Sequence, residues 1–144
     1  MNELIINEAF FQLEDQNQVL IQAILASQSY KNYLQARAQM NNCPEVMQLK
    51  KDFQTAKDNF EKIAAYGSYA PDFRATQRKV RVSKRALDLN EKVAAFRLAE
   101  TDFQQLLDEI GQTLAETISS EIKVDAGNPF FETGNHSCEG NCHG

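Results

Sequence analysis

The chain has 144 residues and a formal net charge of -5, with 42% apolar and 24% charged residues. This balance is typical of an ordinary globular domain, and it excludes collagen-like, mucin-like and wholly disordered proteins. No apolar run approaches the roughly 18 residues of a membrane span, and the N-terminus lacks the basic region of a signal peptide. We therefore expect a cytoplasmic protein with no membrane span.

Glycine and proline are scarce in the body of the chain and frequent at its end. Residues 1–126 hold four of them, Pro44, Gly67, Pro71 and Gly111, whereas residues 127–144 hold four of the six glycines. Alternating apolar runs joined by hairpin dipeptides, the signature of strands, are missing. The sequence therefore predicts an all-α domain over 1–126 and an irregular tail over 127–144.

The predicted helices begin with a loose apolar pattern at Ile5, Ala9, Leu13, Leu20 and Ile24. Ser27 or Ser29 can cap a second helix. The clearest pattern begins at Pro44, which suits a first helical position. Its apolar steps of three and four predict an amphipathic helix over about 44–66, closed by a left-handed Gly67.

A longer apolar stripe follows, and one unbroken helix over 72–122 would be roughly 75 Å long, about twice the width of a compact globule of this length. Asp88 and Glu91 resemble a capping box, and Asn90 is itself a good cap, so we expect a break there. The alternative is an extended helix buried against another subunit. The prediction is an antiparallel bundle of about five helices with a long C-terminal helix, ended by Gly127-Asn128-Pro129.

The tail concentrates metal-ligand residue types in its last nine residues: His136, Cys138, Cys142 and His143. Thiolate and imidazole suit zinc, and thiolates suit iron-sulfur clusters. Zinc would need both histidines, whereas a cluster would need further cysteines, for instance from another chain. The remaining alternative is an unstructured tail with reduced thiols and no metal. The third cysteine, Cys43, is expected to be buried or to cap a helix.

The segment from Arg74 to Arg85 holds six of the fifteen basic residues. On a helix, four of them share one face: Arg74, Arg78, Arg81 and Arg85. That face could meet RNA phosphates or an acidic partner, and the alternative is a solvated face balanced by acids on neighbouring helices. No aromatic residue is interleaved for base stacking, so sequence-specific RNA recognition is not indicated.

Two further features concern binding and catalysis. Phe130 and Phe131 would anchor the tail, either by folding back onto the helices or by docking into a partner. The sequence contains no Gly-rich phosphate loop, no Gly-x-Ser-x-Gly elbow and no His-Glu-x-x-His motif, and both histidines lie away from a scaffold that could orient a base. We therefore expect no enzymatic activity from this chain alone.

Five short runs carry a resemblance over nearly the whole chain: Tyr66-Gly67-Ser68-Tyr69-Ala70-Pro71-Asp72-Phe73, Leu87-Asp88-Leu89-Asn90-Glu91-Lys92-Val93-Ala94-Ala95-Phe96, Leu106-Leu107-Asp108-Glu109-Ile110, Ile122-Lys123-Val124 and Asn128-Pro129-Phe130-Phe131. In their order and spacing they resemble the YlbF/YmcA family, on its YlbF side. The resemblance implies an all-helical bacterial regulatory adaptor that assembles with YmcA-like and YaaT-like proteins. It further implies a role in competence, sporulation and biofilm formation, and in mRNA processing as a specificity factor for RNase Y.

The same resemblance implies a 4Fe-4S cluster shared with partner subunits, with Cys138 and Cys142 as the ligands from this chain. No further tail cysteine follows them. The alternatives are therefore a cluster completed by partners, one that takes His136 or His143 as a ligand, a zinc site, or no metal. The sequence therefore supports three hypotheses about function. The protein is an adaptor, a direct RNA-binding protein, or a homo-oligomeric helical bundle whose tail is held by zinc.

Overall fold

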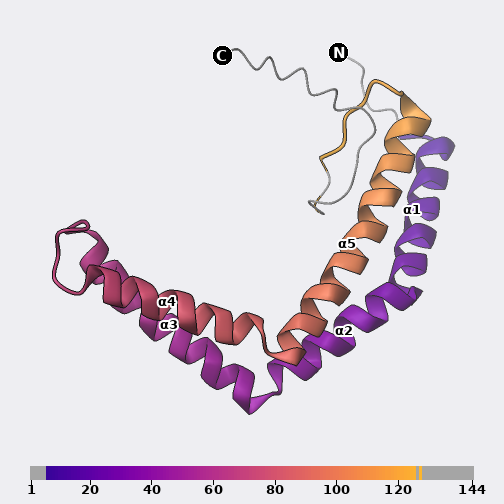
Figure 1. The fold of residues 1–144 in the computed structure, drawn as a ribbon. Coiled ribbons are helices and arrows are strands. Elements are labelled where there is room, and N and C mark those ends of the chain that lie inside the picture. The colour runs from indigo at the N-terminus through magenta and orange to yellow at the C-terminus, as the bar shows by residue number, and fades with distance from the viewer. Residues whose placement is uncertain (1–5, 126, 128–144) are drawn as a thin grey trace, which may run out of the picture. The chain divides into compact units, whose positions relative to one another are not determined.

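The structure is a computed structural model that describes residues 6–125 and 127 (Figure 1). Its regular elements in these residues are five helices: α1 (Glu8–Ala26), α2 (Gln28–Asn41), α3 (Pro44–Ala64), α4 (Phe73–Asp88) and α5 (Glu91–Ile118). The predicted all-α fold with a long C-terminal helix is confirmed. The chain divides into two compact units, and the boundary in the sequence lies between Ala99 and Glu100. Among the described helices, none has the length and apolar character needed to cross a membrane.

Local signals set the first helix boundaries. Ser27 ends α1 and caps α2, because its hydroxyl accepts a hydrogen bond of 3.2 Å from the backbone N–H of Tyr30. Cys43 occupies the N-cap position of α3, and Pro44 is the first helical residue. Gly67 has a φ of 74°, in the left-handed region that glycine adopts without steric cost. The predictions for Ser27, Pro44 and Gly67 are confirmed.

The core of the first unit lies where α2, α3 and the start of α5 meet. It consists of Met40, Cys43, Val46 and Val93, with Leu87 and Phe96 packed against it. Val46 is completely inaccessible to solvent, and the Cys43 side chain is buried, as expected. The rings of Tyr33 and Phe96 pack at a centroid distance of 5.7 Å and extend this core along α2. Apolar contacts therefore fix the junction of three helices.

Helices α3 and α4 run antiparallel and lie side by side as a hairpin (Figure 1). Near the connecting turn, the rings of Phe60 and Phe73 have centroids 5.3 Å apart. Asp72 precedes α4 with a φ of 65°, an uncommon left-handed conformation for a residue other than glycine. Beyond Val46 at the base, no residue of α3 or α4 is buried. The facing apolar side chains of the hairpin are therefore only partly covered.

The predicted break between the last two helices is confirmed, since α4 ends at Asp88 and α5 begins at Glu91. Asn90 is the cap: its side-chain oxygen accepts a 3.0 Å hydrogen bond from the backbone N–H of Lys92. Asp88 has a different role, because its carboxylate binds Lys84 and Arg97. The predicted cap at Asn90 is therefore confirmed, whereas Asp88 does not act as the capping residue of a capping box.

The prediction that the last helix continues to Gly127 is wrong, because α5 ends at Ile118. The hydroxyl of Ser119 accepts a 3.2 Å hydrogen bond from the backbone N–H of Glu121. Serine side chains compete in this way with helical hydrogen bonds. Ile122 continues the apolar spacing in the sequence but lies beyond the helix.

Candidate functional site

The basic residues of the segment 74–85 all lie on α4. The side of α4 that packs against α3 carries half-buried residues at steps of three and four: Phe73, Thr76, Val80, Ser83 and Leu87. The four predicted arginines are exposed and repeat at steps of four, three and four: Arg74, Arg78, Arg81 and Arg85. They therefore share the face of α4 that points away from α3. Their role in binding stays a prediction.

Most of these charges have no acidic partner in the part of the chain that the structure describes. The ion pairs there join Lys57 to Glu61, and Lys84 and Arg97 to Asp88. Five exposed basic residues of α4 take part in none of them: Arg74, Arg78, Lys79, Arg81 and Arg85. This local excess of positive charge on an acidic protein favours an anionic partner.

Asp88 holds the end of α4 next to the start of α5. Its carboxylate accepts hydrogen bonds from Lys84 Nζ at 2.6 and 2.7 Å and from Arg97 at 2.6 Å. The hydrogen bond from Lys84 lowers the pKa of Asp88 most, partial burial opposes it, and the positive charge of Arg97 lowers it further. Asp88 is therefore an ionised clamp that neutralises Lys84 and leaves the rest of α4 basic.

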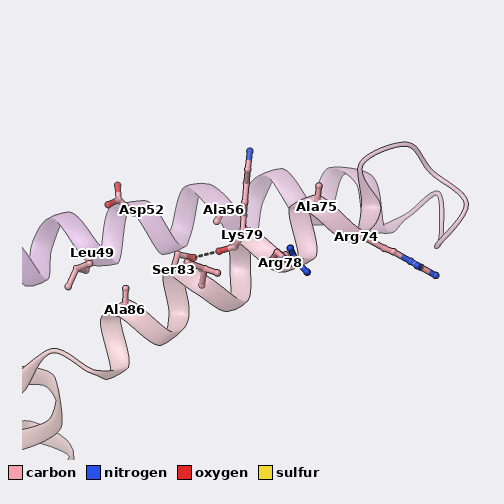
Figure 2. A pocket seen from close by; sticks show the side chains of 10 residues that line it. Leu49, Asp52, Ala56, Arg74, Ala75, Arg78, Lys79, Ser83 and Ala86 are labelled. Carbon is pink, nitrogen blue, oxygen red and sulfur yellow. Dashed lines mark hydrogen bonds between the residues drawn. The ribbon is translucent and has the colours of Figure 1, made fainter.

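An apolar groove with a basic rim runs along one side of the α3–α4 hairpin (Figure 2). We call it the hairpin groove; it has a volume of about 730 Å³ and is lined by Leu49, Asp52, Ala56, Arg74, Ala75, Arg78, Lys79, Val82, Ser83 and Ala86. The floor is made of small or aliphatic side chains, and the rim carries three bases and one acid. In Figure 2, Leu49 extends toward α4, whereas Asp52 extends away from it.

The polar atoms in the floor of this groove are already paired. The hydroxyl of Ser83 donates to the carbonyl oxygen of Lys79 at 2.9 Å, within α4 (Figure 2). Val82 is 62% exposed although its side chain is wholly apolar. The groove therefore offers apolar contact along its floor and positive charge at its edge. Arg81 and Arg85 lie outside it.

A second feature, in the unit after Ala99, fixes the position of Gly127 against α5. The buried carboxylate of Asp108 accepts hydrogen bonds from the backbone N–H of Gly127 at 3.0 Å and from Gln104 Nε2 at 2.9 Å. A Cβ atom on residue 127 would lie 2.5 Å from Gln104 Nε2, so a larger residue at this position would displace the end of the Gln104 side chain. The chain that leads to the tail is thus attached to α5 at this point.

The predicted tail sites lie outside the described residues: His136, Cys138, Cys142, His143, Phe130 and Phe131. Within residues 6–125 and 127, no three residues of the types His, Cys, Asp and Glu form a group that could hold a metal ion. Cys43 is buried in the apolar core, as described above. The metal assignments therefore stay predictions.

Two of these features are not among the predictions from the sequence. The Asp108–Gly127 contact joins residues that are 19 positions apart, so no local pattern could indicate it. The hairpin groove depends on which face α4 turns toward α3, although the alternation of Ala75, Val82 and Ala86 with basic residues was visible. The signal for the groove in the sequence is this stripe of small or aliphatic residues, which lies beside the arginine face of the predicted helix.

Comparisons with known proteins agree with this architecture. The sequence profile described as "Control of competence regulator ComK, YlbF/YmcA" matches residues 13–119. Regulatory protein YlbF of Bacillus subtilis (strain 168) is 37% identical over 130 residues, which are 90% of this chain and 87% of that protein.

A solved structure is similar as well. A chain in the X-ray crystal structure of Bacillus subtilis RicA in complex with RicF superposes with a TM-score of 0.71 and is 34% identical. The match covers 78% of this chain and 98% of that chain. The profile, the curated relative and the solved structure support one assignment: the chain belongs to the YlbF/YmcA family of regulatory proteins.

Proposed function

We propose that this chain is a non-catalytic regulatory adaptor, a subunit that binds partner proteins and redirects an RNA-processing enzyme. The observation that carries the proposal is the similarity over 78% of the chain to a chain crystallised in a complex of two proteins. Apolar side chains on α1 support it, since Phe11, Leu13 and Val19 are each more than half exposed. Apolar surface of this kind is typical of a chain that is covered by a partner.

The proposed partners are YmcA-like and YaaT-like proteins, and the proposed enzyme is RNase Y, with effects on competence, sporulation or biofilm development. The test is co-purification of the tagged chain with these proteins from its own organism. A second experiment maps the 5′ ends of transcripts in strains with and without the gene for this chain. A strain without RNase Y identifies all ends that depend on RNase Y, and we expect a subset of these ends to be lost in the strain without this chain. An unchanged map would contradict the proposal.

The tail is proposed to supply ligands to a 4Fe-4S cluster shared with partner subunits, through Cys138 and Cys142. The donor chemistry of two thiolates supports this. Metal and sulfide analysis, with a visible absorption spectrum, tests it on protein purified anaerobically alone and with its partners. Iron and sulfide are expected only in the complex, and Cys138→Ser or Cys142→Ser should remove them, whereas the buried Cys43→Ser should retain them.

Other outcomes of that analysis discriminate among the alternatives. Zinc in the isolated chain would favour a structural site completed by His136 and His143. No metal in any preparation would contradict a metal role for the tail. Phe130 and Phe131 are proposed to seat the tail on a partner or on the helices.

A second candidate function, direct RNA binding, is favoured by the arginine face of α4, which is exposed and forms no ion pair with the residues that the structure describes. Phosphate contacts would make the RNA affinity of the isolated chain fall steeply with salt. Replacement by glutamine of the four arginines on this face, Arg74, Arg78, Arg81 and Arg85, would abolish that RNA affinity. An adaptor without RNA contacts would show little RNA affinity alone, at any salt concentration.

A further inference from the structure

Helix α1 leaves several of its large apolar side chains exposed in the part of the chain that the structure describes. None of its residues is buried. Five large apolar side chains are exposed: Phe11 by 51%, Leu13 by 67%, Val19 by 61%, Ile21 by 38% and Leu25 by 42%. An isolated helix of this length is marginal in water, and helices in proteins gain most of their stability from a packed apolar face. We therefore expect another surface to cover the apolar side chains of α1.

One exposed stripe of α1 has the spacing that a helix uses to enter a groove. Its members recur at steps of three and four: Phe11, Glu14, Gln18, Ile21 and Leu25. Such spacing places them on one side of the helix, as in helix-in-groove recognition. The stripe is apolar at both ends, and near its middle Glu14 and the adjacent Asp15 carry negative charge.

The charge of α1 is complementary to that of the hairpin groove. Residues 6–30 contain three acids and no base: Glu8, Glu14 and Asp15. Residues 73–87 contain six bases and no acid. No ion pair in the described residues involves Glu14, Asp15, Arg78 or Lys79. Each surface therefore offers the charge that the other lacks.

The two surfaces also match in chemistry and length. The floor of the groove is apolar, with Leu49 on α3 and Val82 and Ala86 on α4, and its small side chains let a helix approach closely. The stripe from Phe11 to Leu25 is about 21 Å long and the groove from Arg74 to Ala86 about 18 Å, at about 1.5 Å per residue. An RNA strand would use the basic rim but leave the apolar floor uncovered.

We propose that α1 of one copy docks in the hairpin groove of a second copy of this chain. Phe11, Ile21 and Leu25 lie on the apolar floor, and Glu14 and Asp15 meet Arg78 and Lys79 at the rim. A two-fold symmetric pair contains this contact twice, since each copy supplies one helix and one groove. The proposal goes beyond the adaptor function, which does not require self-association.

Charge reversal tests the contact in the full chain. One variant carries Glu14→Lys and Asp15→Lys, and a second carries Arg78→Glu and Lys79→Glu. Sedimentation velocity over a range of micromolar concentrations measures association, and circular dichroism verifies helix content. We expect the wild type to form dimers and each variant alone to associate about tenfold more weakly or worse, because like charges then face each other.

The mixture of the two variants is the decisive measurement. Each variant then finds an opposite charge in the other, so an equimolar mixture should regain heterodimers. A control with Arg81→Glu and Arg85→Glu makes the same charge change on α4 outside the groove and should dimerise like the wild type.

Four results would overturn the proposal: a monomeric wild type, unaffected charge-reversal variants, a mixture that stays monomeric, or a control that dissociates as the groove variant does. Co-purification with YmcA-like and YaaT-like proteins reads out the adaptor function separately.

Discussion

At the scale of single residues, Asp88 makes the stability of the helix junction depend on pH. Its pKa is lowered in the folded chain by Lys84 and then by Arg97, so the ionised carboxylate stabilises the fold above the ordinary carboxyl pKa of 3.8. This stabilisation is lost as the pH falls through the lowered pKa of the folded state. Asp88→Asn should therefore lower the melting temperature at pH 7 and have little effect in strong acid. Thermal melts followed by circular dichroism between pH 2 and pH 7 measure this, and an equal loss at every pH would contradict it.

Val46 is the residue whose truncation tests the core of the first unit. Its side chain is 0% exposed, between Met40, Cys43 and Val93. Val46→Ala removes two buried carbon groups and should lower the free energy of unfolding by about 2 kcal/mol, from roughly 0.8 kcal/mol per group plus a cavity term. The neighbouring Met47 is 60% exposed, and Met47→Ala is the matched control, expected to change stability by less than about 0.5 kcal/mol. Urea denaturation compares the two variants, and equal effects would be inconsistent with this core.

At the scale of elements, the break between α4 and α5 rests on the cap at Asn90. Its side chain satisfies the N–H of Lys92, one of the unpaired donors at the helix start. Asn90→Ala should lower the free energy of unfolding by about 1 kcal/mol. Asn59, exposed within α3, provides the control, because Asn59→Ala should leave stability unchanged or raise it slightly through better helix propensity. A loss at residue 59 as large as that at residue 90 would argue against the cap.

Helix starts were predictable because their causes are local. Ser27 and Asn90 each accept a hydrogen bond from a backbone N–H two or three residues further on. Pro44 lacks the N–H that would be unpaired at the first helical position. The end of α5 was not predictable from apolar spacing, since Ile122 keeps the spacing although Ser119 has already diverted the backbone. The arginine face of α4 follows from helical periodicity alone. The hairpin groove does not, because it needs the pairing of α4 with α3.

At the scale of the whole molecule, the sign of the charge changes along the chain in blocks. Residues 6–30 are acidic without a base, 73–87 are basic without an acid, and 98–122 are again acidic without a base. Such blocks carry little information about the fold, since isolated surface charges contribute little stability. They do bias which surfaces meet when chains associate, because complementary potentials steer encounters and fix register. The charge pattern is therefore better explained by assembly than by folding.

Assembly should be visible in the hydrogen exchange of α1. Since the described part of the chain buries no residue of α1, the amides of α1 should exchange readily in dilute protein. At concentrations where copies associate, docking in the hairpin groove should slow exchange in α1, whereas amides around Val93 in the core should be equally protected at both concentrations. Exchange followed by mass spectrometry at two concentrations measures this, with the Arg78→Glu and Lys79→Glu variant as the control in which α1 stays unprotected. Equal protection of α1 at both concentrations would mean that α1 obtains its stability within a single chain, and the exposed stripe from Phe11 to Leu25 would then need another partner.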